Sequence, residues 1–179
     1  FDNAKSGVQH NIPFQTNFKM FKHFSVSVGG QYTETWTGKT IRYNNYSEDI
    51  GAVKDTIGGF DRFGVYNYNA SVTTKVYGII NFKPKNKVQS IRHTITPSIT
   101  YSNNPSFEEY YDTYIIDANG NTAEYTRFQG GLYNAPGKNY SSSIGLTINN
   151  TIEAKVKPKD STETELRKIN IFKTLNIST

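Results

Sequence analysis

The chain has 179 residues, enough for one ordinary domain, and a formal net charge of +5. Only 35% of its residues are hydrophobic and its mean hydropathy is −0.62, which is too polar for a helical membrane protein, and no apolar run approaches the roughly 18 residues of a membrane helix. The absence of cysteine excludes a disulfide framework and a thiolate metal site, and the dispersed Lys and Arg residues lack the basic stripe of a nucleic-acid-binding protein.

Regular alternation of apolar and polar residues predicts two long strands at the start of the chain. They cover about 6–19 and 23–37, with a tight turn at about 20–22. In the second strand, Phe24 and Tyr32 bracket an apolar face of roughly 20–25 Å once tilt is included. That height matches the hydrocarbon layer of a bilayer.

A long polar segment at about 38–62 comes next and is predicted to be a loop. Two further strands are predicted at about 63–82 and 88–102, with a short basic turn at 83–87 between them. The first of these strands again carries aromatic residues at both ends of its apolar face. A second long segment, about 103–138, follows and is acidic and tyrosine-rich in its first part.

Within this second segment, the Asn119-Gly120 step is a hairpin turn signal. Asp117, Asn119 and Asn121 also have the one-three-five spacing of a calcium loop. However, Gly120 is misplaced for such a loop, and Phe128 stands where the bidentate Glu belongs. A hairpin turn is therefore the better interpretation.

The strongest alternation lies at about 139–157, where a largely apolar set of residues alternates with a polar set. Ordinary strands have about 5–6 residues, whereas a membrane strand needs about 9–11 for the hydrocarbon alone, so this length favours a membrane. A turn at about 158–167 leads to a sixth strand at about 168–179. Lys173 interrupts the apolar set of that strand, and a bulge near Phe172-Lys173 would restore the pattern.

The connections run short, long, short, long, short, as in bacterial outer-membrane barrels with short periplasmic turns and long extracellular loops. The predicted fold class is all-β: an antiparallel transmembrane β-barrel segment of about six long strands, forming a single segment over residues 1–179. About eight strands make the smallest closed barrel, so we expect the chain to be part of a larger barrel. The short turns are assigned to the periplasm, and 38–62 and 103–138 to the outside.

Two groups of side chains are candidates for function in such a barrel. Aromatic residues make up 14% of the chain, with 13 Tyr and 11 Phe, as expected if two interfacial belts must be supplied. The belt candidates are Phe24, Tyr32, Trp36, Tyr66, Tyr68, Phe82, Tyr101 and Tyr140. The lumen-facing candidates, which could contact a plug protein or guide an anionic lipid, are Lys75, Arg92, Glu153 and Lys155.

No arrangement of residues predicts an enzyme, a cofactor or a metal site. The histidines are far apart in the sequence and lack metal-ligand spacing. Glu108, Glu109 and Asp112 could together hold a divalent cation that bridges lipid phosphates, but a solvated acidic loop is the better interpretation.

The second half of the chain resembles a known family. The residues that carry the resemblance are Ile91–Ser98, Tyr101, Pro105–Phe107, Tyr110, Tyr111, the run from Ser143 through Asn149-Asn150 to Glu153–Lys157, Lys168–Ile171 and Leu175–Thr179. They are similar to the barrel of the LptD family of lipopolysaccharide (LPS) assembly proteins, in its Bacteroidetes-type branch. The similarity covers Ile91–Thr179, and the first half of the chain fits in its general barrel character.

The resemblance implies a large barrel, integral to the outer membrane of a Gram-negative bacterium, that releases LPS sideways into the outer leaflet without catalysis. The partners it implies are membrane lipids, LPS, a periplasmic Lpt bridge, a plug lipoprotein of the LptE type and the remainder of the barrel. A nucleic-acid partner is not expected. The residues alone leave two alternatives open: another outer-membrane barrel, such as a porin or a TonB-dependent nutrient receptor, and a soluble β-sandwich binding domain.

Overall fold

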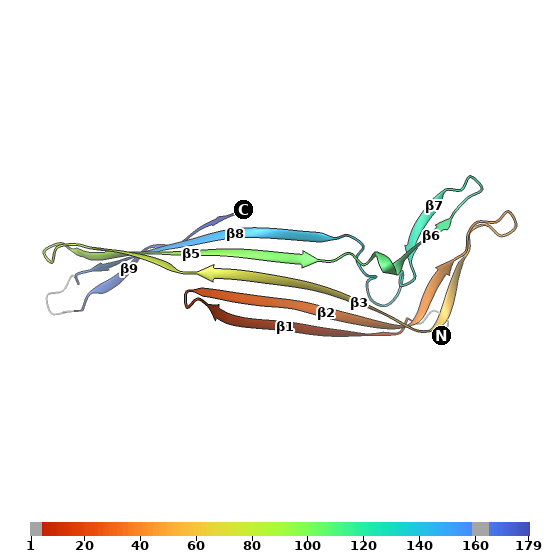
Figure 1. Ribbon diagram of the computed structural model, residues 1–179, viewed down its shortest axis with the longest axis horizontal. Coiled ribbons are helices and arrows are strands. Elements are labelled where there is room, and N and C mark those ends of the chain that lie inside the picture. The colour runs from red at the N-terminus through yellow and green to blue at the C-terminus, as the bar shows by residue number, and fades with distance from the viewer. Residues whose placement is uncertain (1–4, 159–164) are drawn as a thin grey trace. The chain divides into compact units, whose positions relative to one another are not determined.

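The computed structural model describes residues 5–158 and 165–179 and is built from β-strands (Figure 1). Its elements are β1 (Gly7–Met20), β2 (Phe24–Tyr43), β3 (Lys54–Thr74), β4 (Val76–Asn81), β5 (Val88–Asn104), the short 3-10 turn η1 (Glu108–Tyr110), β6 (Tyr111–Ile115), β7 (Thr122–Thr126), β8 (Ser141–Val156) and β9 (Arg167–Ser178). Within these two described ranges, no helix has the length and apolar character needed to cross a membrane.

Within the main sheet, the strands are paired in the order in which they occur along the chain, apart from β4. A seven-stranded sheet has the order β1-β2-β3-β5-β8-β9, with β4 paired to β5, and β6 and β7 form a separate two-stranded sheet. The pairs β4–β5, β6–β7 and β8–β9 are antiparallel. The prediction of an all-β, antiparallel segment is therefore confirmed, with β1 and β9 as the two ends of the sheet order.

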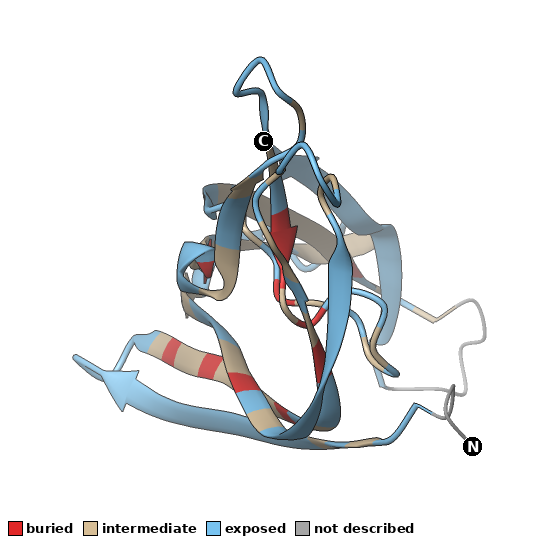
Figure 2. Ribbon diagram, turned by 90° about the vertical axis from the view of Figure 1, so that its right-hand side faces the viewer, coloured by how far each residue is buried: buried red, intermediate tan, exposed pale blue. Residues whose placement is uncertain are grey.

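The chain forms two compact units. The first unit comprises Phe1–Phe14, Gly29–Tyr68 and Asn103–Ser142, and the second comprises Gln15–Val28, Asn69–Ser102 and Ser143–Thr179. Buried side chains are few and occupy short stretches (Figure 2). In the second unit, the buried hydrophobic side chains of the described residues are Val26 and Ala154, while many large apolar side chains are exposed. The second unit is thus a sheet with almost no core of its own.

The predicted loop at 38–62 is shorter in the structure, because both flanking strands extend into it. Strand β2 continues to Tyr43 and β3 begins at Lys54, so the connection narrows to 44–53. The extension of β2 has a physical cause within the first unit. The Ile41 amide donates to the Arg127 carbonyl oxygen at 2.9 Å, and the Tyr43 ring stacks on Tyr114 at 4.3 Å. The segment 103–138 therefore supplies partners that keep β2 extended.

The predicted continuous strand at 63–82 is divided at Lys75 into β3 and β4. The division occurs where β3 runs past the start of its partner strand, β2, at Phe24. The Thr74 hydroxyl donates to the carbonyl oxygen of His23, the residue just before β2, at 2.9 Å. Beyond this point β4 pairs with β5, from Val76 opposite Ile95 to Asn81 opposite Ser90. Lys75 therefore lies at a strand break and not within a strand.

The predicted irregularity in the last strand is confirmed. The β8–β9 register shifts between Asn150 and Ile152 and again between Ile152 and Glu153. Because Asn150 pairs with Leu175 and Ile152 with Phe172, two residues of β9 stand opposite one residue of β8, which is a bulge. Of the predicted turn at 158–167, residues 159–164 lie outside the described residues.

The hairpin predicted at Asn119-Gly120 is also confirmed. Strands β6 and β7 pair from Tyr111 opposite Thr126 to Ile115 opposite Thr122. Gly120 has a φ of 81°, a conformation that glycine adopts without steric cost. The Asp117 carboxylate accepts the Asn119 and Asn121 backbone amides at 2.9 and 3.1 Å. The acidic side chain thus closes a turn, as in an Asx turn.

Gly30 of β2 is covered by the ring of Phe14 from the neighbouring strand β1. A Cβ atom added to Gly30 would lie 2.4 Å from the Asn67 carbonyl oxygen and 2.5 Å from the Phe14 ring. Only glycine therefore permits this close approach of β2 to β3. Glycine kinks bend a sheet, and an aromatic ring over a glycine helps to fix the register of the strands.

Candidate functional site

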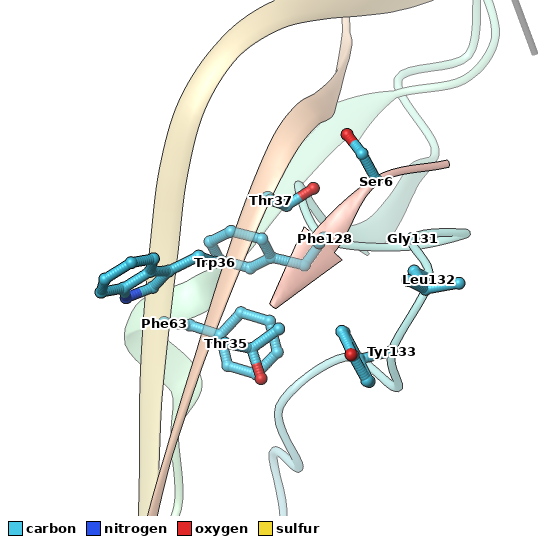
Figure 3. Close-up of a pocket in the computed structure, with 10 residues that line it drawn as sticks. Ser6, Thr35, Trp36, Thr37, Phe63, Phe128, Gly131, Leu132 and Tyr133 are labelled. Carbon is cyan, nitrogen blue, oxygen red and sulfur yellow. The ribbon is translucent and has the colours of Figure 1, made fainter. Parts of the chain in front are cut away.

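The core of the first unit forms where the segment 103–138 folds against β2 and β3 (Figure 3). The Phe128 ring, only 4% exposed, lies 4.6 Å from the Phe63 ring and 5.8 Å from the Tyr110 ring. Thr35 of β2 beside them is 2% exposed. The cavity left between these side chains holds about 10 Å³, which is no more than one water molecule needs. This is therefore an anchoring site for the segment and not a ligand pocket.

Arg127 fixes the segment on the same core by three kinds of contact. Its Nε donates to the Asp61 carboxylate at 2.7 Å, and its carbonyl oxygen accepts the Ile41 amide. Its guanidinium carbon lies 4.6 Å from the centre of the Phe128 ring and 5.7 Å from that of Tyr110, which is cation–π distance. Charge, backbone and ring contacts thus converge on one residue.

The β6–β7 hairpin is attached to the β2–β3 connection. The Tyr114 ring stacks on Tyr43, and the Tyr46 amide donates to the Ile115 carbonyl oxygen at 2.8 Å. The Ile115 amide in turn donates to Asn45 Oδ1 at 2.9 Å. Both long connections of the chain therefore form one ordered assembly.

Two charged groups in this assembly have shifted pKa values. Hydrogen bonds from the Asn121 side chain and from backbone amides lower the pKa of Asp117. The hydrogen bond between Lys138 and Glu124, which form an ion pair, raises the pKa of Lys138. Both groups remain accessible to solvent, so these shifts report local hydrogen bonding and carry little stability.

Tyr110 covers an edge of β3 beyond the end of β5 at Asn104. Its hydroxyl group accepts the Gly64 amide at 3.1 Å and lies 3.3 Å from the Gly64 carbonyl oxygen. The Asn67 carbonyl group faces β2 at Gly30. Backbone groups of successive residues point to opposite edges of a strand, and Gly64 is three residues from Asn67. The backbone groups of Gly64 therefore face the other edge of β3, which pairs with β5. One side chain thus replaces the missing part of β5.

Several belt candidates of the first unit surround a charged cluster on β2 and β3. Glu34 accepts hydrogen bonds from Trp36 Nε1 at 2.8 Å, from the Tyr32 hydroxyl at 3.1 Å and from Arg62 Nη1 at 2.9 Å. A cavity of about 360 Å³ adjoins it, lined also by Tyr66. Rings with polar tips held around an ion pair suit the boundary between lipid and water.

Tyr68 and Tyr140 are the other belt candidates of the first unit. Tyr68 is on β3 and is 41% exposed, and Tyr140 precedes β8 and accepts a hydrogen bond from Asn103 Nδ2 at 3.0 Å. Phe24, Phe82 and Tyr101 belong to the second unit. There Phe24 is 37% and Phe82 38% exposed.

Of the four lumen-facing candidates, the structure brings together Arg92 and Glu153. Arg92 Nη2 of β5 lies 2.7 Å from Glu153 Oε2 of β8, and the guanidinium also lies 5.8 Å from the Tyr77 ring. Lys155 is instead opposite Lys168 in the β8–β9 register, so two like charges are neighbours. Arg92 and Glu153 thus neutralise one another, whereas Lys155 and Lys168 place two positive charges side by side.

The anchoring residues Asp61, Arg127 and Phe128 were missed by sequence reasoning. Asp61 fell within a predicted loop, and Phe128 was noted only as a mismatch to a calcium loop. The one available signal was the aromatic content of 103–138, which is unusual for a solvated loop. Among the residues that the structure describes, no three His, Cys, Asp or Glu side chains are grouped so that they could hold a metal ion.

Long antiparallel strands paired in chain order, with apolar side chains exposed, define a segment of a β-barrel wall. A family model described as LptD protein matches residues 1–179, and the chain belongs to this family. LptD proteins are outer-membrane proteins with a role in LPS transport and assembly. Members of the family interact with LPS and with partners of the Lpt pathway. The resemblance found in the second half of the sequence is thereby confirmed at the level of the family. Comparison with curated proteins and with solved structures gave no match.

Proposed function

We propose that this chain forms part of the wall of a larger outer-membrane barrel that releases LPS sideways into the outer leaflet, without catalysis. Membership of the LptD family carries this proposal. The exposed apolar residues of the second unit support it, because Ile144 is 74% and Ile80 61% exposed. Such surface is stable in a bilayer, where lipid tails cover it, and is a liability in water.

In this proposal the two long connections face outward and the short turns face the periplasm. The belt candidates lie at the two lipid–water boundaries, and Lys75, Arg92, Glu153 and Lys155 face the lumen. An exposed β-strand edge in lipid is unfavourable, because each unpaired backbone group costs several kcal/mol. β1 and β9 therefore pair with other strands of the barrel. A plug of the LptE type and the periplasmic Lpt bridge complete the pathway.

Cysteine labelling tests the orientation, because the chain has no cysteine of its own. In the intact protein, otherwise free of cysteine, Asn119→Cys at the tip of the β6–β7 hairpin is expected to react with a membrane-impermeant maleimide in whole cells. Lys85→Cys, in the turn between β4 and β5, is expected to react only after the outer membrane is permeabilised. The reverse pattern would overturn the assignment.

Depletion in cells tests the transport function. Removal of the protein is expected to abolish newly delivered LPS at the cell surface, detected with an LPS-specific antibody, and re-expression is expected to restore it. A photo-crosslinking residue at position 155 is expected to capture LPS in transit, whereas one at the exposed Ile144 is expected to capture phospholipid and LPS alike. Unchanged surface LPS after depletion would refute the proposal.

A further inference from the structure

The cavity of about 360 Å³ beside Glu34 combines aromatic walls with charged groups. Its described lining belongs to the first unit and comes from β2, from β3 and from the segment that follows β5. Aromatic side chains form much of the wall, namely Tyr32, Phe63, Tyr66, Phe107 and Tyr110. The Tyr66 ring is supported by Phe107, with 5.6 Å between the ring centres and an edge-to-face angle of 80°. The cavity therefore has a flat apolar surface whose position is fixed before a ligand arrives.

The charged part of the cavity is an ion pair that can accept a further partner. Glu34 Oε1 accepts Trp36 Nε1 at 2.8 Å and Arg62 Nη1 at 2.9 Å, whereas Oε2 accepts the Tyr32 hydroxyl at 3.1 Å. A carboxylate has about four lone-pair sites and a guanidinium five N–H donors, so both groups keep hydrogen-bonding capacity. The Arg62 side chain is 65% exposed, which leaves its other donors within reach of a ligand.

The lining of this cavity carries more negative than positive charge. Glu109 of η1 adds a second carboxylate to the Glu34–Arg62 pair. Among the described lining residues there is no lysine, no histidine and no second arginine. A phosphate or carboxylate ligand would therefore meet like charge here. An uncharged ligand with hydroxyl groups can instead donate to the Glu34 carboxylate and accept from the Arg62 guanidinium.

We infer that this cavity binds an uncharged sugar ring of the LPS saccharide. A sugar ring carries hydroxyl groups at its edge, which suit the Glu34–Arg62 pair, and C–H groups on its face, which suit the Tyr66 ring. The cavity volume is near the lower end of the roughly 300–1,000 Å³ of ligand sites, so it suits one sugar ring of a larger molecule.

The source of the sugar follows from the proposed orientation. The first unit contains both connections assigned to the outside, so the cavity lies toward the cell exterior, where the saccharide of released LPS is found. The assignment to LPS thus rests on the proposed function. The preference for an uncharged sugar rests on the lining residues alone.

Binding of an uncharged oligosaccharide, prepared from LPS of the same bacterium, tests the inference on the intact protein in neutral detergent. Calorimetry measures the affinity. Tyr66→Ala removes the ring surface, and Glu34→Gln removes the charge from the hydrogen-bond acceptor. Each is expected to weaken binding about tenfold, whereas Tyr66→Phe, which keeps the ring, is expected to retain the affinity of the unmodified protein.

Two other ligands test the chemistry and the source of the sugar. Inorganic phosphate is not expected to compete with the oligosaccharide, and competition would overturn the preference for an uncharged ligand. Maltoheptaose, an uncharged oligosaccharide unrelated to LPS, is expected to bind more weakly. Equal affinity for maltoheptaose would overturn the assignment to LPS.

The matched controls remove a tyrosine and a glutamate that lie outside the cavity. Tyr77→Ala on β4 removes a ring that is 56% exposed, close to the 48% of Tyr66. Glu124→Gln on β7 removes a carboxylate that also pairs with a cation, Lys138. Both controls are expected to bind the oligosaccharide as the unmodified protein does. Equal losses in the controls and the cavity variants, or no loss in Tyr66→Ala and Glu34→Gln, would overturn the inference.

Two further measurements keep the outcome decisive. Heat-modifiable gel migration reports folding, and if Glu34→Gln does not fold, Arg62→Gln at the more exposed partner replaces it, with the same loss of about tenfold expected. Delivery of LPS to the cell surface is scored separately with the unmodified protein. If delivery fails while oligosaccharide binding is lost only in the cavity variants, the sugar site stands and the transport proposal fails. If delivery occurs while the cavity variants bind normally, the transport proposal stands and the sugar site fails.

Discussion

Phe128→Ala tests whether a single ring holds the segment 103–138 on the strands. The ring is 4% exposed and contacts Phe63, Tyr110 and the Arg127 guanidinium. Burial of a phenylalanine is worth about 1.5–3 kcal/mol, and complete removal from a packed core costs about 3–5 kcal/mol because a cavity remains. Since the neighbouring cavity holds only about 10 Å³, the site is tightly packed and the larger value applies.

This loss is expected to fall on docking of the segment and not on the membrane strands. Docking is a local equilibrium, so a loss of about 3 kcal/mol raises the exchange rate of the protected amides more than about 100-fold. Hydrogen exchange with mass spectrometry, on the intact protein in detergent, measures peptides of Thr122–Phe128 against peptides of β5. Only the former are expected to exchange faster.

Phe60→Ala is the matched control, since it removes the same ring from a position that is 69% exposed. Phe60 makes an edge contact with Trp36 at 5.7 Å, which is worth at most about 1.5 kcal/mol. The reasoning fails if Phe128→Ala exchanges no faster than Phe60→Ala. It also fails if β5 loses as much protection as the segment does.

Three further predictions concern backbone conformation and charge. Gly30→Ala is expected to destabilise the sheet by about 1–3 kcal/mol, because the new Cβ would lie 2.4 Å from the backbone oxygen of Asn67; urea unfolding followed by tryptophan fluorescence measures the loss. Gly145→Ala, whose new Cβ would have its nearest atom at 4.0 Å, is the control, and equal unfolding midpoints of the two variants would contradict the prediction. Lys22→Gly is expected to stabilise the β1–β2 turn by about 1 kcal/mol, since Lys22 has a φ of 63°, and a lower unfolding midpoint would refute the assignment of strain. Hydrogen bonds to the charged carboxylate lower the pKa of Asp117 in the folded protein. The turn is therefore stabilised at pH values above the ordinary pKa of 3.8, and it loses that stabilisation as the pH falls through the lowered pKa of the folded state. NMR titration is expected to show the amides of this turn shifting below pH 3.8 in the natural protein but not in Asp117→Asn, and a transition above pH 3.8 would contradict the sign.

Alternation in the sequence was sufficient where a strand has two different faces. Strand β8 (Ser141–Val156) was recognised from its apolar and polar sets, and Lys173 in the apolar set of the next strand pointed to the bulge that the structure contains. The same signal failed at the start of β3. There every residue from Lys54 to Phe60 is exposed, so this part of the strand does not need an apolar face. Its two glycines are also typical of a loop.

The anchoring site was beyond the reach of sequence patterns for a different reason. Asp61 and Arg127 form their ion pair across a separation of 66 residues, and neither belongs to a motif. Phe128 and Phe63 are likewise single aromatic residues in an aromatic-rich chain. Such pairs are chosen by the tertiary fold, so they become visible only when the segment is placed on the strands.

The Tyr110 hydroxyl at Gly64 solves a problem of slippage between β3 and β5. A one-residue slip would turn every side chain to the wrong face and is forbidden by the pattern of faces, but a two-residue slip keeps all faces correct. Alternation therefore cannot prevent β5 from sliding along β3. The tyrosine occupies both backbone groups of Gly64, so β5 cannot advance past Asn104 without displacing it. It acts as an end stop that selects one alignment among several that the side-chain pattern would otherwise tolerate.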